Sequence, residues 1–209
     1  MSLFKKKDRC PNCQIVLDKR PSRKTKCKNC NKYIFIRSGN LFTEEQANII
    51  DSLKMFGFSR DQYFEAEKQV MKKFGHQPKY RDVIWYICNQ EILIHRDDWN
   101  YLSQLYYNMA LFLNKHEKEC FHILQQSRKA QLLYLKEMGI EEVEIHAIDR
   151  CPSCLKLDGK ILKIDEALKQ MPIPNKDCTN IRDDKKRSFC ICQYWPTSEI
   201  VREARNKYE

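Results

Sequence analysis

The sequence predicts an α+β protein in three parts: a small cysteine-closed module over residues 1–40, a helical bundle over 41–140, and a cysteine-rich α/β module over 141–209. Three observations predict this architecture. Pairs of cysteines occur near both ends of the chain, helix-capping signals punctuate its middle, and short alternating apolar segments flank the cysteines. Hydrophobic residues make up 42% of the 209 residues, which is enough to build a packed core.

The first module contains two C-x-x-C pairs, Cys10 with Cys13 and Cys27 with Cys30, separated by 13 residues. Each pair can form a tight turn that directs two sulfurs to one point, and two such turns complete a tetrahedral site that suits Zn²⁺. Residues 14–17 and 33–36 are predicted to form short strands. Over residues 8–37 this pattern resembles the zinc-ribbon family. A redox pair would need a single C-x-x-C beside a βαβ unit, and disulfides are disfavoured because no secretory signal begins the chain.

The excess of positive charge is confined to the first 40 residues, which hold 12 of the 38 basic residues but only two of the 28 acidic ones. The net charge of +10 therefore belongs to this module. Such asymmetry favours a polyanionic partner, which could be DNA, RNA or an anionic surface, and of these we expect a nucleic acid. The alternative is an ordinary solvated surface rich in lysine. The expected phosphate-contacting residues are Lys19, Arg20, Arg23, Lys24, Lys26 and Lys28.

Five helices are expected between residues 41 and 140. Capping boxes beginning at Thr43 and Ser59 start the first two, which end at Gly57 and Gly75. The others span about 79–95, 98–114 and 117–138. The third helix is apolar nearly all round and should be central, with Leu93 among its apolar residues. The expected inward residues of the first two helices are Ile49, Ile50, Leu53 and Phe56, then Tyr63, Val70, Met71 and Phe74.

The last module is predicted to combine strands, one short helix and a second metal site. Residues 143–148 alternate as a strand, and a turn at Asp158 and Gly159 joins strand-like segments 155–157 and 161–164. A short helix over 165–170 and a terminal helix over 197–208 follow. Five cysteines compete for four ligand places on a second Zn²⁺, with His146 as a substitute ligand. They are Cys151, Cys154, Cys178, Cys190 and Cys192.

The motif Cys-Pro-x-Cys-x-x-Leu-Asp-Gly-Lys, followed by prolines and Cys-x-Cys, resembles the cysteine module of phage Mu F-like head-morphogenesis proteins over residues 149–195. The resemblance implies a phage or prophage setting and a protein partner in capsid assembly near the portal. The closing motif departs from the family, because 11 residues separate Cys178 from Cys190 and the family's histidine is absent.

These observations favour a non-catalytic two-zinc protein that binds nucleic acid through its basic first module. No phosphate-binding loop or dinucleotide fingerprint is found, so no small-molecule cofactor is expected. No apolar run is long enough to span a membrane, and we expect a cytoplasmic protein. A scaffolding role in assembly is the alternative. A metal-dependent nuclease that uses Asp149, Asp158 and Lys160 is a further alternative, in which carboxylates hold a metal ion and the lysine polarises water.

Overall fold

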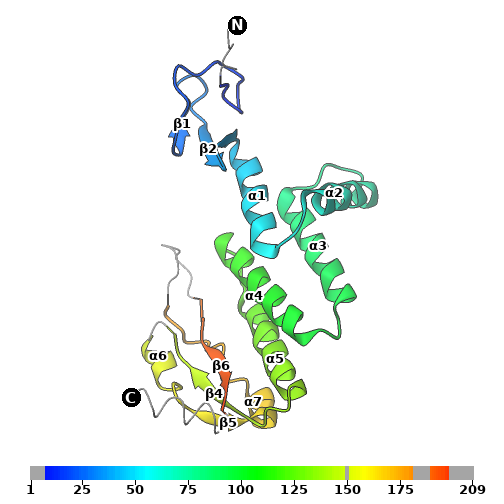
Figure 1. Ribbon diagram of the computed structural model, residues 1–209, viewed down its shortest axis with the longest axis vertical. Coiled ribbons are helices and arrows are strands. Elements are labelled where there is room, and N and C mark those ends of the chain that lie inside the picture. Colours follow the sequence, from blue (N-terminus) through cyan, green and yellow to red (C-terminus); the bar gives the residue numbers. More distant parts are fainter. Residues whose placement is uncertain (1–7, 149–150, 181–188, 198–209) are drawn as a thin grey trace, which may run out of the picture. The chain divides into compact units, whose positions relative to one another are not determined.

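The computed structural model describes residues 8–148, 151–180 and 189–197. In these residues the protein is a mixed α+β structure with seven helices and two small antiparallel sheets, which confirms the predicted α+β class. The chain divides into two compact units, Met1–Ile87 and Cys88–Glu209, and each is described by itself (Figure 1). The boundary between the units falls inside the segment 41–140. Among the described helices, none is both long enough and apolar enough to cross a bilayer.

The first unit begins with a small sheet of order β1-β2-β3, made of Thr25–Lys26, Tyr33–Arg37 and Asn40–Phe42. The strand expected over 33–36 is β2. The strand expected over 14–17 is wrong, because this segment makes only an isolated bridge between Arg9 and Val16. Its backbone closes a turn instead: Gln14 has a φ of 61° and its N–H donates to the carbonyl of Cys10.

Two helices follow, α1 (Glu44–Phe56) and α2 (Arg60–Phe74), and both begin at the predicted capping boxes. In each box the cap hydroxyl accepts the N–H of the third helical residue, whose side chain accepts the cap's own N–H. Gly57 and Gly75 end the helices with φ values of 74° and 73°, which a residue without a Cβ adopts readily. The boundaries of these helices were therefore predictable from local chemistry.

The buried face of α2 differs from the expected one. Tyr63, Ala66 and Val70 are buried, whereas Met71 and Phe74 are 44% and 57% exposed. Spacings of three and four residues place the buried side chains on one stripe of the helix. Met71 lies one residue beyond that stripe, so it points about 100° away from Val70. The expectation that Met71 and Phe74 face inward was wrong.

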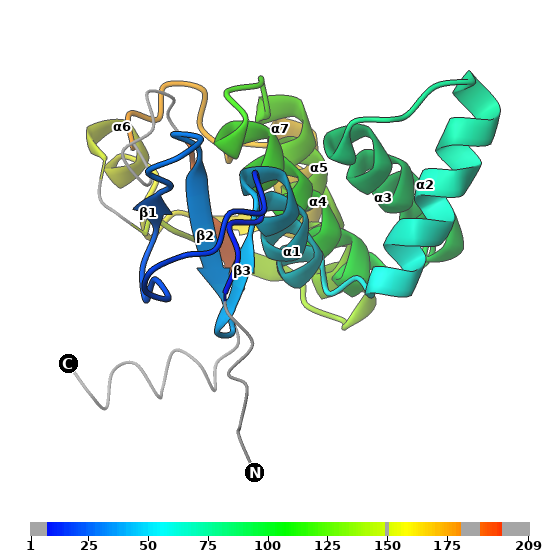
Figure 2. The same cartoon turned by 90° about the horizontal axis from the view of Figure 1, so that it is seen from above.

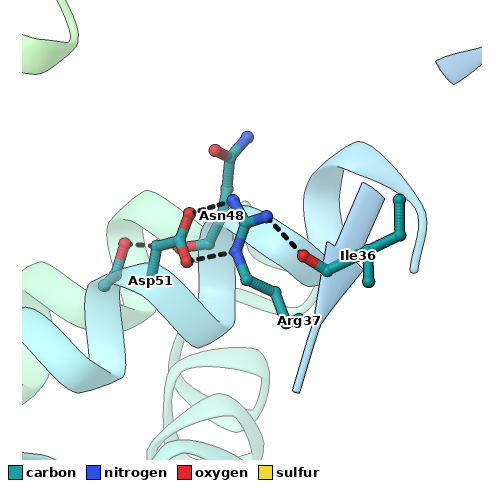
Figure 3. A network of polar contacts seen from close by, with 5 residues as sticks. Ile36, Arg37, Asn48 and Asp51 are labelled. Atoms are coloured by element: carbon teal, nitrogen blue, oxygen red, sulfur yellow. Dashed lines mark hydrogen bonds and ion pairs between the residues drawn. The ribbon is translucent and has the colours of Figure 1, made fainter. Parts of the chain in front are cut away.

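A bidentate ion pair joins the first sheet to α1. The Nε and Nη2 atoms of Arg37, on β2, both donate to the carboxylate of Asp51 at 2.6 Å (Figure 3). The remaining terminal nitrogen, Nη1, donates to the carbonyl of Ile36 at 2.8 Å. A planar guanidinium bound along one edge fixes orientation as well as distance. The sheet and α1 are thus held in one arrangement.

Helix α3 (Tyr80–Ile94) contains the boundary between the two units. Its first three turns bury Val83, Ile84, Ile87 and Cys88, as expected for an apolar central helix. Its last turn does not, because Leu93 is 67% exposed. The expectation that this helix is central therefore does not hold for its last turn.

In the second unit, helices α4 (Trp99–Lys115) and α5 (Phe121–Glu137) lie side by side (Figures 1 and 2). They match the fourth and fifth helices predicted from the sequence, although α5 begins four residues later than expected. Leu124 and Leu132 of α5 join one hydrophobic cluster with the strands and cysteines that follow. The helix pair and the C-terminal module therefore share a single core.

The second sheet has the order β5-β4-β6, with β4 (Glu142–His146) between β5 (Ile161–Lys163) and β6 (Gln193–Pro196). Val143 and Ile145 of β4 are fully buried, as the alternating pattern predicts. Helix α7 (Ile164–Gln170) matches the predicted short helix. The predicted terminal helix lies outside the described residues from position 198 onward.

The strand expected over residues 155–157 is wrong, because Leu155 ends a short helix, α6 (Pro152–Leu155). The sulfur of Cys151 accepts the N–H of Cys154 at 3.4 Å, and Pro152 occupies the first helical position. The cysteine pair therefore closes its own helical turn, and β5 pairs with β4 instead.

Candidate metal centres and a basic surface

The first cysteine group lies in the first unit, at two turns of similar geometry. Each turn follows one C-x-x-C pair and passes through a residue with a left-handed backbone, Gln14 with φ 61° and Asn31 with φ 56°. The N–H of each of these residues donates to the carbonyl of the first cysteine of its pair. The two turns bring all four ligand atoms within 4.8 Å of one another. They belong to Cys10, Cys13, Cys27 and Cys30.

The distances between these sulfurs fit a tetrahedral metal site. The sulfurs of Cys10 and Cys30 are 3.9 Å apart, and those of Cys13 and Cys27 are 3.8 Å apart. A metal ion held by four thiolates at about 2.3 Å separates the sulfurs by about 3.8 Å. All eleven cysteines are free thiols. The group therefore has the geometry to hold one metal ion. The four cysteines expected to share one site lie together.

Local hydrogen bonds favour the thiolate form at two of the four positions. The backbone amide of Ile15 and the side chain of Asn29, 3.6 Å from the sulfur, lower the pKa of Cys13 to about 6. Backbone amides of Cys30 and Asn29 lower the pKa of Cys27. Thiolates are the form that binds metal, so these amides prepare the group for a cation. Asn29 is a contributor that the sequence pattern did not single out, although it lies inside the second pair.

Three lysines of the first unit line a cavity beside this group. The cavity has a volume of about 290 Å³, and its apolar wall is formed by Ile15, Val16, Leu17 and Ile34. Three of the six predicted phosphate-contacting residues, Lys19, Lys26 and Lys28, line the same cavity. It lies next to Cys27, so the lysines and the first cysteine group share one small region.

The other predicted phosphate-contacting residues have different positions. Arg20 pairs with Asp8 at 2.5 Å and also donates to the carbonyl of Gly39, so it ties the module together. Arg23 is exposed. Lys24 lies over two aromatic rings of β2. The structure thus gathers three of the six residues at the cavity and assigns Arg20 intramolecular contacts.

The second cysteine group lies in the second unit and consists of two overlapping triads. Cys151, Cys154 and Cys178 form one triad, and Cys154 with Cys190 and Cys192 forms the other. The sulfurs of Cys151 and Cys178 are 3.8 Å apart, and those of Cys154 and Cys190 are 3.9 Å apart. All five residues are buried. This group also has the sulfur spacing of a metal–thiolate site.

Hydrogen bonding distinguishes Cys190 from Cys192. The Cys192 side chain and the backbone N–H of Asn175, which lies 3.4 Å from the sulfur, lower the pKa of Cys190 to about 5. The same interaction with Cys190 raises the pKa of Cys192, and burial adds to the increase. These interactions favour the thiolate form at Cys190 and the protonated form at Cys192.

A buried arginine accompanies the second group. Arg128 of α5 is 4% exposed, and its Nε and Nη2 atoms have no hydrogen-bond partner among the described residues. Its guanidinium carbon lies 5.3 Å from the ring centre of Tyr107. Burial lowers the pKa of Arg128, and negative charge at Cys190 and Cys192 acts in the opposite direction. Arg128 was not singled out from the sequence, although it stands four residues from both Leu124 and Leu132 in a buried row.

The remaining candidates do not join a metal group. His146 stacks on Trp195 with ring centres 4.3 Å apart and belongs to neither cysteine group. The carboxylate of Asp158 accepts the N–H of Ala147 at 2.8 Å, which closes the turn before β5. Asp149, the other acid of the nuclease alternative, lies outside the described residues. Within the described chain, the groups that could hold a metal contain only cysteines.

No family model, curated protein or solved structure matches this chain.

Proposed function

We propose that this chain is a non-catalytic protein with two zinc centres that binds nucleic acid through its first 40 residues, folded as a zinc ribbon. The observation that carries the proposal is the convergence of Lys19, Lys26 and Lys28 on one cavity beside the first cysteine group. Positive charge held on a small rigid platform is the electrostatic requirement for binding a phosphate backbone. The metal supplies that rigidity, because this module has few buried residues of its own.

The choice of Zn²⁺ follows from the ligand set. Four cysteine sulfurs at tetrahedral spacing suit Zn²⁺, and all-cysteine sites are normally closed and structural. In the second group we assign Cys151, Cys154, Cys178 and Cys190 as ligands. Two short sulfur pairs, Cys151 with Cys178 and Cys154 with Cys190, support this choice. Cys192 is then the fifth thiol, which donates to Cys190.

Metal content of the purified full chain tests this assignment. We expect two zinc ions per chain by elemental analysis, one ion in Cys190→Ser, and two ions in Cys192→Ser. Loss of one ion in Cys192→Ser with retention in Cys190→Ser would reverse the roles of the two cysteines. A wild-type chain that takes up no zinc would contradict both zinc centres.

The salt dependence of binding tests the nucleic-acid interface. In the full chain, changing Lys19, Lys26 and Lys28 together to Gln removes three charges from the cavity. The slope of log K against log salt should fall by up to about 0.9 per lost phosphate contact on duplex DNA. The matched control changes three exposed lysines of α2 to Gln, and we expect its slope to equal that of the wild type. These control residues are Lys68, Lys72 and Lys73.

Equal slopes for both triple variants would show that the cavity lysines do not contact phosphates. A stable homo-oligomer or a protein complex without affinity for nucleic acid would instead support the assembly role. Light scattering on the same samples separates these outcomes.

A further inference from the structure

One face of the β1–β2 pair carries aromatic rings alternating with lysines. Lys26 lies opposite Tyr33 in the register of the two strands, and Thr25 lies opposite Ile34. Successive side chains of a strand point to opposite faces, so Tyr33 and Phe35 share the face away from Ile34. Ile34 is 1% exposed and packs with Cys10 and Cys27, whereas Tyr33 is 45% exposed. Tyr33 therefore lies on the outer side of the module, and Phe35 on the same face is half-buried.

The lysines of this face cover the rings with their amines. The Nζ atom of Lys24 is 4.4 Å from the ring centre of Tyr33 and 4.8 Å from that of Phe35. The Nζ atom of Lys26 is 6.0 Å from the centre of Tyr33. We call Lys24, Lys26, Tyr33 and Phe35 together the stacking face. Both lysines are exposed, so their side chains can move away from the rings without breaking buried contacts.

The energies favour exchange of a lysine amine for a base. An exposed cation–π contact is worth about 0.5–1 kcal/mol, whereas a base stacked on an aromatic side chain is worth about 1–3 kcal/mol. The displaced amine keeps its charge and stays within reach of the phosphate of the stacked nucleotide. One side chain thus neutralises the backbone where the ring binds the base. A surface that bound phosphates through charge alone would not need aromatic residues for binding.

We infer that the stacking face binds unpaired nucleotides, with bases on Tyr33 and Phe35 and phosphates at Lys24 and Lys26. This inference rests on the proposed nucleic-acid function and gives it a substrate class, single-stranded DNA or RNA. Bases within a duplex are stacked on one another and offer no free face along the helix. Lys26 also lines the neighbouring cavity, so one strand can contact the stacking face and the cavity together.

Fluorescence anisotropy with the zinc-loaded full chain tests this inference. The probes are a labelled 12-nucleotide oligothymidine, the matching oligouridine, and a duplex of equal length. We expect the wild type to bind both single strands more tightly than the duplex. Tyr33→Leu should weaken single-strand binding about 5- to 150-fold, which corresponds to about 1–3 kcal/mol of stacking, and leave the salt slope unchanged.

Two further variants separate stacking from charge and from misfolding. Tyr33→Phe retains the ring and should bind as the wild type does. Lys26→Gln retains both rings, and its salt slope on a single strand should fall by about 0.7 for one lost phosphate contact. Circular dichroism and zinc content establish that each variant is folded. If Tyr33→Leu alters the fold, Phe35→Leu takes its place in the same comparison.

The outcomes distinguish this inference from the function on which it rests. Equal affinity for duplex and single strands, with no effect of removing either ring, would overturn the stacking face while the charge-based interface remained. Absence of salt-dependent binding to every probe would overturn both. Loss of binding in Tyr33→Leu together with full binding by Tyr33→Phe is the result that supports base stacking.

Discussion

Arg128 is a charged residue at a position where helix periodicity places core residues. Leu124 and Leu132, four residues to either side, are fully or almost fully buried. A buried guanidinium is costly unless negative charge compensates it. A metal ion held by four thiolates would leave a net charge of about −2 on the site and would supply that compensation. The arginine and the second cysteine group are thus electrostatically complementary.

Removing this charge should weaken metal binding at the second group. Outer-shell partners of a metal site typically contribute about 10- to 100-fold to affinity, so we expect Arg128→Met to lower the zinc affinity of the second group by a factor in that range. Competition with a chromogenic chelator measures it. Arg96→Met, at an exposed arginine paired with Asp97, is the control and should leave the affinity unchanged. An unchanged affinity in Arg128→Met would mean that the arginine compensates another charge.

At the scale of elements, the helices were predicted well where local chemistry decides their ends. The boxes at Thr43 and Ser59 and the glycines that follow α1 and α2 act within one turn of chain. The strands were predicted less well. Thr25 and Lys26 of β1 carry no apolar signal, and they form a strand only because the cysteine turns bring them beside β2. Residues 14–17 have the apolar residues typical of a strand, but they form a turn instead.

The same difference between local and long-range interactions explains which residues of the candidate sites could be predicted. Regular C-x-x-C spacing was enough to identify the first four cysteines as one group. The roles of Cys190 and Cys192 depend on Asn175, a residue 15 positions before Cys190 that reaches it only in the folded chain. Arg128 likewise comes near enough to interact electrostatically with Cys190 and Cys192 only in the folded chain. Local sequence patterns do not predict which distant segments of the chain come together.

Helix α2 should give the protein an alkaline limit of stability. Burial raises the pKa of Tyr63 above the ordinary value of 10.0. At high pH the unfolded chain therefore loses the phenolic proton while the folded chain keeps it. The contribution of Tyr63 to the free energy of unfolding is present below pH 10. It declines above pH 10, by up to about 1.4 kcal/mol per pH unit.

Urea unfolding between pH 8 and 11 should show that the free energy of unfolding declines less steeply with pH in Tyr63→Phe than in the wild type. The exposed Tyr33→Phe is the control, and an equal decline in both variants would contradict the assignment.

For the whole molecule, the two cysteine groups stand in cores of very different size. The cluster around the first group contains three buried residues, Cys10, Cys27 and Ile34. The cluster around the second contains 18 buried residues among those described, drawn from α4, α5 and the second sheet. Small modules with little core depend on metal for folding, whereas a larger core retains structure without it.

Removal of metal should therefore affect the two units unequally. After treatment of the full chain with a strong chelator, hydrogen exchange should become fast throughout residues 9–42. The amides of β4 and of the α4–α5 pair should retain most of their protection, because their apolar contacts persist. Re-addition of Zn²⁺ should restore the original pattern. Equal loss of protection in both units would show that the second core also requires its metal.

The bidentate contact between Arg37 and Asp51 has a consequence for any ligand of the first sheet. A guanidinium edge seated on a carboxylate resists rotation about the junction, which a single lysine contact would permit. The sheet and α1 therefore turn together as one piece. A strand bound at the first sheet would therefore be held in a fixed orientation relative to α1.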